Sequence, residues 1–237
     1  MSSYAISDLH GYPLQKFKAL LEKVNFSEDD TLYIIGDVID RNGDGGVEML
    51  RYIMAQPNFE FLIGNHEMML LACSFLFTEN VSENEIPENP DRQASLERYL
   101  RNGGGVTIRN LRKLLEENPD EFDEIFDFLW NAYVYTTCTA GDRDFVLVHG
   151  GFPDFSPEKE LSEYDPFDLV WERPTLETEY FSDKLTIIGH TPAYVYGEEY
   201  EGKVIRTKTW INIDTGASVG FPPALLRLDD LTEFYGD

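Results

Sequence analysis

Basic side chains are scarce in this sequence. Its 237 residues include 19 Lys and Arg against 44 Asp and Glu, which gives a formal net charge of −25. Proteins that bind nucleic acids or acidic membranes need a basic surface, and no stripe of Lys and Arg offsets the acidic residues here. The charge therefore argues against both kinds of partner, whereas bound divalent cations would neutralise part of it.

Cysteines and long apolar runs are also few. The two cysteines, Cys73 and Cys138, fall in an apolar helix pattern and a strand pattern, so we expect reduced core thiols and not a disulfide framework. No run of roughly 18 or more apolar residues occurs, and no membrane span is expected. The first residues hold neither the basic nor the apolar segment of a signal peptide, so we expect a cytoplasmic protein.

Strand and helix patterns alternate in the N-terminal part of the chain. Apolar, β-branched runs predict strands over residues 4–7, 31–35 and 59–63, and apolar residues at helical spacing predict helices over residues 13–24 and 45–56. This alternating order implies a parallel sheet with right-handed crossovers. Each strand leads into polar side chains, and open α/β sheets bind ligands at the carboxyl ends of their strands.

The middle of the chain is helical in pattern. An apolar helix is expected over residues 68–77, then an acidic loop over residues 79–90, then helices over residues 92–101, 106–117 and 119–130. We interpret residues 78–131 as a helical insertion that packs over the sheet, and not as an independent domain. Such an insertion can form one wall of a substrate cleft.

Strand patterns return after Tyr133. Strands are expected over residues 134–139, 144–148, 185–188, 210–213 and 224–228, with a hairpin turn at 140–143 and the strand at 224–228 as the last. These strands predict a second, more antiparallel sheet. Residues 1–237 are therefore expected to form one α/β domain, an α/β/β/α sandwich with the helical insertion at about 78–131.

All four histidines of the chain follow predicted strands and stand next to Gly or Asn: His10, His66, His149 and His190. Asp8, Asp37 and Asn65 occupy the same strand ends. Oxygen and imidazole donors without a thiolate suit manganese, iron or zinc, and they argue against a structural zinc site or an iron–sulfur cluster. The pattern therefore predicts a metal site at the strand ends.

Five short motifs follow one another along the chain: Asp8-x-His10-Gly11, Gly36-Asp37-x-x-Asp40-Arg41, Gly64-Asn65-His66-Glu67, His149-Gly150 and Gly189-His190. Their order and rough spacing, from residue 4 to about 216, resemble the phosphoprotein phosphatase branch of the calcineurin-like metallophosphoesterases. Trp171-Glu172-Arg173 and Asn102-Gly103-Gly104 look most like the bacterial and bacteriophage lambda type of serine/threonine protein phosphatase. The resemblance implies the metallophosphoesterase-like α/β/β/α sandwich.

The resemblance also implies two divalent metal ions, manganese first and iron or zinc as alternatives. It implies six metal ligands: Asp8, His10, Asp37, Asn65, His149 and His190. The first three would hold one ion, and Asp37 would bridge to a second ion that the other three complete. Such a pair clamps phosphate oxygens and lowers the pKa of a shared water, so that a bridging hydroxide attacks phosphorus in line.

Four catalytic roles follow from the same resemblance. His66 would protonate the departing alkoxide as general acid, and Asp40 would hold its ring in place. Arg41 and Arg173 would neutralise the phosphoryl oxygens as charge builds on them. For Arg173 a stacked surface position is an open alternative, and Asp214 near the site is read as a turn former or a site residue.

The implied function is a two-metal phosphomonoesterase that acts on phosphoserine and phosphothreonine in proteins. The alternative is symmetrical hydrolysis of diadenosine tetraphosphate, for which the insertion offers basic residues. A non-catalytic scaffold with this fold ranks below both, because the chain keeps every ligand and the general acid. The physiological substrate, the native metal, the acceptance of phosphotyrosine and the oligomeric state stay open.

Overall fold

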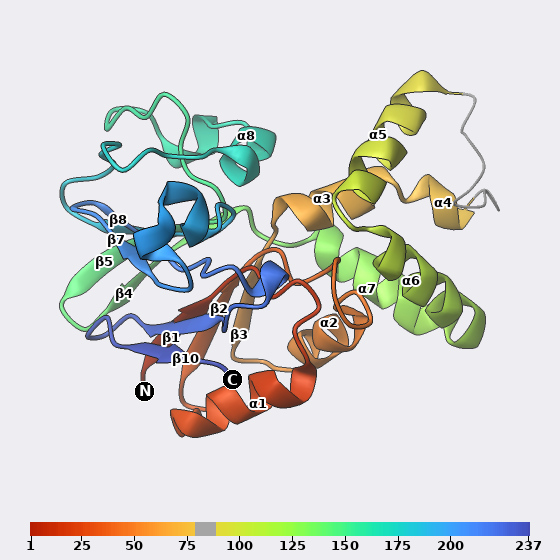
Figure 1. Ribbon diagram of the computed structural model, residues 1–237, viewed down its shortest axis with the longest axis horizontal. Helices are drawn as coiled ribbons and strands as arrows, with labels where there is room; N and C mark the ends of the chain where they lie inside the picture. Colours follow the sequence, from red (N-terminus) through yellow and green to blue (C-terminus); the bar gives the residue numbers. More distant parts are fainter. Residues whose placement is uncertain (79–88) are drawn as a thin grey trace.

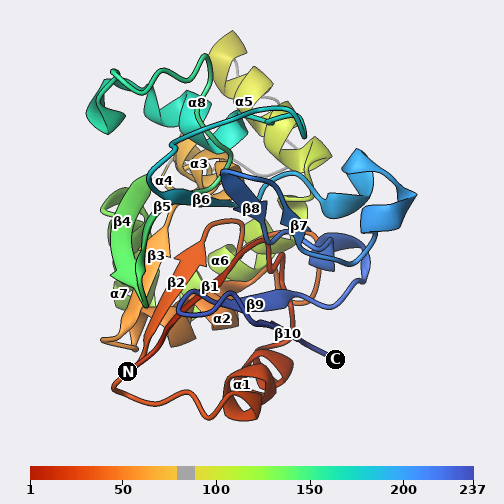
Figure 2. The ribbon, with the colours of Figure 1, turned by 90° about the vertical axis from the view of Figure 1, so that its left-hand side faces the viewer.

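The computed structural model describes residues 1–78 and 89–237, and within them two five-stranded sheets lie face to face (Figure 2). The first sheet has the strand order β10-β9-β1-β2-β3 and the second the order β4-β5-β6-β8-β7. The strands of the first sheet are β1 (Ser3–Ile6), β2 (Thr31–Ile35), β3 (Phe59–Leu62), β9 (Ala224–Arg227) and β10 (Glu233–Tyr235). Those of the second are β4 (Tyr135–Ala140), β5 (Arg143–Val148), β6 (Leu185–Ile188), β7 (Ile205–Arg206) and β8 (Trp210–Asn212).

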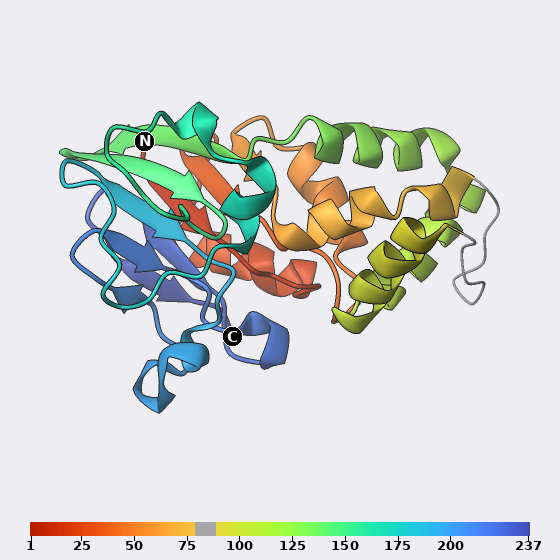
Figure 3. The same ribbon diagram turned by 90° about the horizontal axis from the view of Figure 1, so that it is seen from above.

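Helices cover the outer faces of the two sheets and form a lobe at one end. The helices α1 (Leu14–Lys23) and α2 (Val47–Met54) connect the strands β1, β2 and β3 and lie on the outer face of the first sheet (Figure 1). The lobe contains α3 (Asn65–Ala72), α4 (Phe75–Thr78), α5 (Pro90–Arg101), α6 (Gly105–Glu117) and α7 (Pro119–Trp130). Figure 3 shows this lobe beside the sheets. The connections between strands of the second sheet contain α8 (Pro166–Trp171) and short 3-10 helices at Leu161–Glu163, Ala193–Tyr196 and Glu198–Tyr200, and another 3-10 helix, Ala217–Val219, lies between β8 and β9.

The core follows the two-residue period of the strands. On β2, Ile34 packs with the helices, whereas its neighbours Tyr33 and Ile35 pack against the second sheet. On β5, Leu147 faces the first sheet, and Val148 faces the outer layer that includes α8. Successive side chains of a strand point to opposite faces, so both sheets are buried on two sides. This layering confirms the predicted α/β/β/α sandwich.

Strand directions agree with the prediction in the first half of the chain only. The β1-β2 and β2-β3 pairs are parallel, as the alternating pattern predicts. The expectation of a more antiparallel second sheet is wrong, because each sheet holds two parallel and two antiparallel pairs. The long connections after β5 and β6 leave room for the crossovers that parallel pairs need.

Three short elements of the structure were not predicted from the sequence. The strand at 224–228 is not the last, since β10 follows it, and neither β7 nor α8 is expected. Two- and three-residue strands are too short to show a period, and α8 has six residues. The expected hairpin at 140–143 is confirmed by the antiparallel pairing of Ala140 with Arg143.

The helices of the predicted insertion lie close to their expected positions. Buried side chains of α5, α6 and α7, such as Leu96, Ile108 and Ile125, belong to the same apolar cluster as those of α1 and α2. The helix expected over 68–77 is two helices, α3 and α4, because the chain turns at Cys73 and Ser74. The acidic loop expected at 79–90 lies almost wholly outside the described residues.

Cys73 is buried, Cys138 is half-buried, and both are free thiols. Burial raises the pKa of Cys73 to about 12 and that of Cys138 to about 11, so both thiols are protonated near neutral pH. Across the two described ranges, no helix combines the length and apolar character needed to cross a bilayer.

Candidate active site

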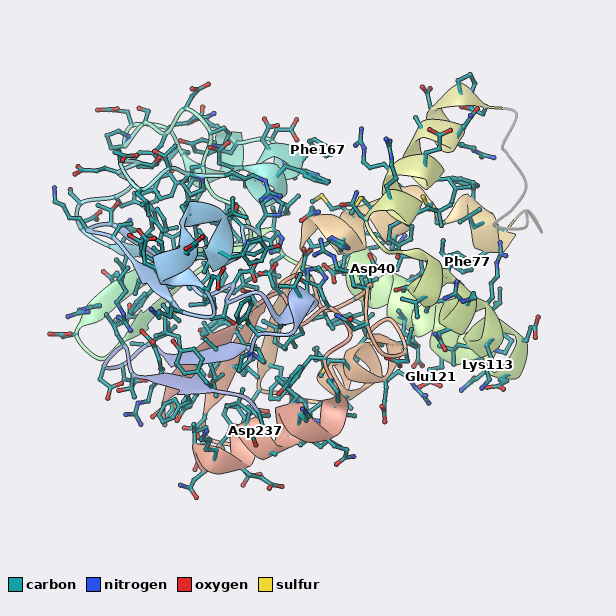
Figure 4. All side chains as sticks on the ribbon, viewed as in Figure 1. Asp40, Phe77, Lys113, Glu121, Phe167 and Asp237 are labelled. Atoms are coloured by element: carbon teal, nitrogen blue, oxygen red, sulfur yellow. The ribbon has the colours of Figure 1, made fainter. Side chains whose placement is uncertain are left out.

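Six parallel strands bring their carboxyl ends to one edge of the molecule. Three of them belong to the first sheet (β1, β2 and β3) and three to the second (β5, β6 and β8). The loops that follow these strands, or for Asn65 and His66 the first turn of α3, carry nearly every predicted site residue: Asp8, His10, Asp37, Asp40, Arg41, Asn65, His66, His149, His190 and Asp214. Residues far apart in sequence therefore meet between the sheets and the helical lobe, where Figure 4 labels Asp40.

Asp37 lies at the centre of this cluster. Its Oδ2 is 3.6 Å from Nε2 of His10 and 3.9 Å from Nε2 of His66, and its Oδ1 is 3.3 Å from Nε2 of His149. All four side chains are at least 97% buried. Asp37 belongs to both groups of side chains that are close enough to share a metal ion, namely His10 with Asp37 and His66, and Asp37 with His149 and His190.

Asn65 and Asp8 complete the cluster. The Oδ1 of Asn65 is 3.1 Å from Nε2 of His149 and 2.8 Å from Nδ1 of His190. One carboxylate oxygen of Asp8 accepts the backbone N–H of His190 at 3.0 Å, and the other is 3.9 Å from Nε2 of His10. The structure thus brings all six predicted metal ligands together, and by distance alone it adds His66 to the His10 group.

The chemistry of these side chains fits divalent cations. The Nδ1 of His10 lies 3.0 Å from the Ile39 carbonyl and the Nδ1 of His149 lies 2.7 Å from the Ile35 carbonyl, so each ring directs its Nε2 toward the cluster centre. Oδ1 of Asp8 and Nε2 of His190 are buried without a hydrogen-bond partner among the described residues. Buried polar atoms normally have partners, and a cation would supply one here.

Protonation in the cluster also suits metal binding. Burial lowers the pKa of His10 to about 3 and that of His190 to about 2, so both rings are neutral near pH 7. Burial would lower the pKa of His149 too, but the Asp37 carboxylate raises it to about 10. A cation at this position would displace the proton from His149, because only neutral imidazole is a ligand.

Asp40 holds the ring of His66 from the side away from Asp37. Its Oδ2 is 2.6 Å from Nδ1 of His66, and this pair is fully buried. The other nitrogen of His66, Nε2, lies 3.1 Å from a guanidinium nitrogen of Arg41, whose side chain is exposed. This order of contacts leaves Nε2 of His66 facing the cluster and the solvent-exposed guanidinium.

Two residues of the helical lobe fix Asp40, and the sequence analysis did not identify them. The Tyr99 hydroxyl of α5 donates to Oδ1 of Asp40 at 2.8 Å, and the Thr107 hydroxyl of α6 donates to the same oxygen at 2.5 Å. Both residues are fully buried. The Gly103 carbonyl between these helices accepts the backbone N–H of Arg41 at 3.2 Å. The predicted insertion is therefore attached directly to Asp40 and Arg41.

Tyr99→Phe and Thr107→Val are each expected to lower the free energy of unfolding by about 1.5–3 kcal/mol, because each removes a hydrogen bond to a buried carboxylate. Urea denaturation measures the change. The control is Thr139→Val on the exposed β4-β5 hairpin, where the Thr139 hydroxyl donates to Asp144 at 2.6 Å, and we expect a change within about 0.5 kcal/mol. Equal effects at the buried and exposed sites would contradict this view of Asp40.

Glu67 is a third residue whose role was not predicted from the sequence. Its carboxylate accepts the backbone N–H groups of Asp37 at 2.9 Å, Val38 at 2.9 Å and Gly64 at 3.0 Å. Burial raises the pKa of Glu67 to about 7. The side chain ties the loop after β2 to the start of α3, and it thereby holds Asp37 and His66 in register. The position of Glu67 in the Gly64–Glu67 motif is the sequence signal that could have indicated this role.

Arg173 is exposed at the edge of the site, whereas Asp214 is buried. The guanidinium of Arg173 donates to the Thr191 hydroxyl at 3.1 Å, next to His190 in sequence, and its side chain is exposed. Asp214 is buried, and its carboxylate accepts the backbone N–H of Gly216 at 2.9 Å, which is the turn interaction expected of Asp before Thr-Gly. Arg173 therefore belongs to the rim, and Asp214 stabilises its own turn.

Backbone strain is concentrated in the site. Nine described residues other than Gly have positive φ, and six of them are predicted site residues: Asp8, His10, Asp37, Asp40, Arg41 and His190. A left-handed conformation costs about 1–2 kcal/mol for a residue with a Cβ atom, and such strain gathers at functional sites. The surrounding fold holds these loops in place against their local preference.

Curated proteins and solved structures provide two comparisons. The chain is 32% identical over 163 residues to a symmetrical bis(5'-nucleosyl)-tetraphosphatase of Buchnera aphidicola, which covers 67% of this chain and 56% of that protein. It is 29% identical over 160 residues to the protein of the same name from Salmonella typhimurium, with coverages of 65% and 54%. The chain spans little more than half the length of these curated relatives.

The solved structures show the fold alone, since their sequence identities are low. A putative diadenosine tetraphosphatase has a TM-score of 0.66 at 13% identity and covers 98% of this chain and 91% of its own. A protein serine/threonine phosphatase from Saccharomyces cerevisiae has a TM-score of 0.56 at 16% identity, with coverages of 96% and 72%. Residues 1–212 match the family described as calcineurin-like phosphoesterase. This chain therefore belongs to the calcineurin-like phosphoesterases.

Proposed function

We propose that this protein is a metal-dependent hydrolase that cleaves dinucleoside tetraphosphates symmetrically into two nucleoside diphosphates. The observation behind the chemistry is the buried cluster of Asp, Asn and His side chains around Asp37. The similarity to symmetrical bis(5'-nucleosyl)-tetraphosphatases supports the substrate. The sequence motifs alone put phosphoproteins first and the dinucleotide second, and the similarity to these relatives reverses that order.

Family membership and the donor set imply divalent metal ions. In this proposal one ion would be held by Asp8, His10 and Asp37, and a second by Asp37 together with Asn65, His149 and His190. When bound, such ions neutralise phosphate charge and lower the pKa of a coordinated water to about 7. Manganese is our first choice of metal, with iron and zinc as alternatives.

The other site residues act on the leaving group and on the phosphoryl charge. His66 is proposed to donate a proton from Nε2 to the departing oxygen, while Asp40 holds Nδ1 at 2.6 Å and stabilises the protonated ring. Arg41 and Arg173 present exposed guanidinium groups at the rim, where they would pair with phosphoryl oxygens. Each of these side chains is placed by a contact described above.

The test compares two substrates with manganese-loaded protein at equal concentration: diadenosine tetraphosphate and a phosphoserine peptide. We expect a higher kcat/KM for the dinucleotide and ADP as the sole nucleotide product on chromatography. A preference for the phosphopeptide would instead support a phosphoprotein phosphatase. Formation of ATP with AMP would contradict symmetrical cleavage, and inactivity on both substrates and on p-nitrophenyl phosphate would support the scaffold alternative.

A further inference from the structure

A pocket opens between the helical lobe and α8. It has a volume of about 560 Å³ and is lined by Arg98, Arg101, Asn102, Phe167 and Trp171. Arg98 and Arg101 lie in the last turn of α5, Asn102 directly follows this helix, and the two aromatic residues come from α8. Figure 4 labels Phe167, which extends from α8 on the side of the lobe. The walls of this pocket are therefore two aromatic rings on one side and two guanidinium groups on the other.

The pocket adjoins the proposed phosphoryl site at two points. The Trp171 ring meets the His190 ring edge to face, with 5.7 Å between ring centroids. On the opposite wall, Asn102 directly precedes Gly103, whose carbonyl accepts the backbone N–H of Arg41. The pocket wall therefore contacts His190 through Trp171 and adjoins Arg41 through the segment after α5, so the pocket lies next to the Asp37 cluster.

The aromatic wall offers a ring face to a ligand. Phe167 is 48% exposed, and its ring lies 5.9 Å from the Trp171 ring at an interplanar angle of 34°. The Trp171 indole N–H is buried without a hydrogen-bond partner among the described residues. The wall therefore presents ring surface, and not this buried N–H, to a ligand. Flat, partly polar ligands suit such a wall.

The basic wall is unusual in this acidic protein. Arg98 and Arg101 are both exposed, and neither forms an ion pair with a carboxylate of the described residues, although acidic residues outnumber basic ones by 44 to 19. Within the described parts of the chain, Arg101 donates a side-chain hydrogen bond to the Glu97 carbonyl of its own helix. Arginine side chains without carboxylate partners, facing aromatic rings, form the arrangement that binds a nucleobase together with phosphate.

An apolar pocket of about 400 Å³ continues from this one, since both are lined by Arg98, Phe167 and Trp171. It extends toward side chains of α3 and α7 such as Met68 and Leu129. Each volume falls in the range of small-molecule sites. The apolar part would also accept a side chain of a peptide, but the two arginines and the stacked rings favour a nucleotide.

We propose that the pocket between α5 and α8 binds one nucleoside of the substrate, with its base on the Phe167 and Trp171 rings and its polyphosphate chain near Arg98 and Arg101. This proposal rests on the proposed function, for which it names the part of the site that recognises the nucleoside. It makes Phe167 and Arg98 specificity-determining residues, and it assigns the bond cleavage to the Asp37 cluster alone.

The test measures equilibrium binding by calorimetry with manganese-loaded protein and two probes, AMP and ribose 5-phosphate. Both probes carry the same phosphate, so the ratio of their Kd values reports the contribution of the base. Stacking on an aromatic side chain changes affinity for a base by roughly tenfold or more. We expect the wild type to bind AMP about tenfold more tightly than ribose 5-phosphate, and Phe167→Ala to bring the ratio close to one.

Arg98→Ala is expected to weaken binding of both probes. The controls are Tyr133→Ala, an aromatic residue that is 67% exposed and lines a different pocket, and Lys113→Ala, which Figure 4 shows on the lobe far from Phe167. Neither control should change the ratio or the two Kd values. Retained binding of ribose 5-phosphate by Phe167→Ala would show that this variant is folded.

Equal affinities of the wild type for AMP and ribose 5-phosphate would overturn the pocket assignment, as would an unchanged ratio in Phe167→Ala. A raised KM of Phe167→Ala for a phosphopeptide, without a base contribution, would assign the pocket to a protein substrate. The outcomes separate from those of the proposed function. If the protein cleaves the dinucleotide but binds AMP and ribose 5-phosphate equally, the pocket assignment alone is overturned. If AMP binds more tightly than ribose 5-phosphate, Phe167→Ala removes this difference and the dinucleotide is not cleaved, the proposed function alone is overturned.

Discussion

Asp37→Asn is expected to remove more than 99% of the manganese-dependent hydrolysis of p-nitrophenyl phosphate. The Asp37 carboxylate lies 3.3–3.9 Å from nitrogen atoms of three histidines, so it is the one group that both candidate metal sites share. Replacement of residues that merely orient metal ligands typically costs 10- to 100-fold, and loss of a shared charged ligand should exceed about 100-fold. Steady-state rates with added manganese measure this loss.

The Asn side chain keeps an oxygen for the backbone N–H of His66, which Asp37 accepts at 3.0 Å, so the fold should survive the substitution. Thermal unfolding provides a readout that does not depend on activity. Manganese should raise the Tm of the wild type, because a ligand that binds only the folded state stabilises it, and it should raise the Tm of Asp37→Asn much less. An active variant with a normal manganese response would refute the central role of Asp37.

The second large effect concerns His66. His66→Asn is expected to lower kcat by about 10²–10⁴-fold, the usual contribution of a general acid, with little change in KM. The loss should depend on the leaving group, because a more basic leaving oxygen needs the proton more. Phenyl phosphate should therefore lose more rate than p-nitrophenyl phosphate, and the ratio of the two rates measures the difference.

This comparison also decides between two roles for His66, since its Nε2 lies close enough to His10 and Asp37 to share a metal ion with them. A metal ligand should lose equal rate on both esters and bind manganese more weakly. Asp37→Asn is the matched control for that pattern. Equal losses in His66→Asn, together with a weaker manganese response, would count against a general acid.

The cluster could be predicted from the sequence because its residues carry two signals at once. Asp8, Asp37 and Asn65 each follow an apolar, β-branched strand, and parallel strands place their carboxyl ends on one edge. The four histidines stand at the same kind of position, where no core requirement calls for them. Local pattern and spacing were therefore sufficient for both the sandwich and the residues that meet in it.

The contacts around Asp40 could not be predicted in this way. Tyr99 and Thr107 lie 59 and 67 residues from Asp40, and in their helices they resemble ordinary core positions. Only the packing of α5 and α6 on the loop after β2 gives their hydroxyl groups a partner. The strands β6 and β8 were predicted, but their parallel direction was not, because a strand pattern shows burial and not the direction of the neighbouring strand.

The positive φ angles of the site residues affect how this protein responds to selection for thermal stability. His10 and Arg41 adopt conformations that Gly or Asn accept at lower cost, and Asp8 and Asp37 are carboxylates buried among histidine side chains. A directed-evolution library sorted only by heat resistance would therefore enrich replacements at these positions first. The variants selected in this way would be more stable but inactive. Thermostabilisation of this protein therefore needs a screen that measures catalytic turnover as well as heat resistance.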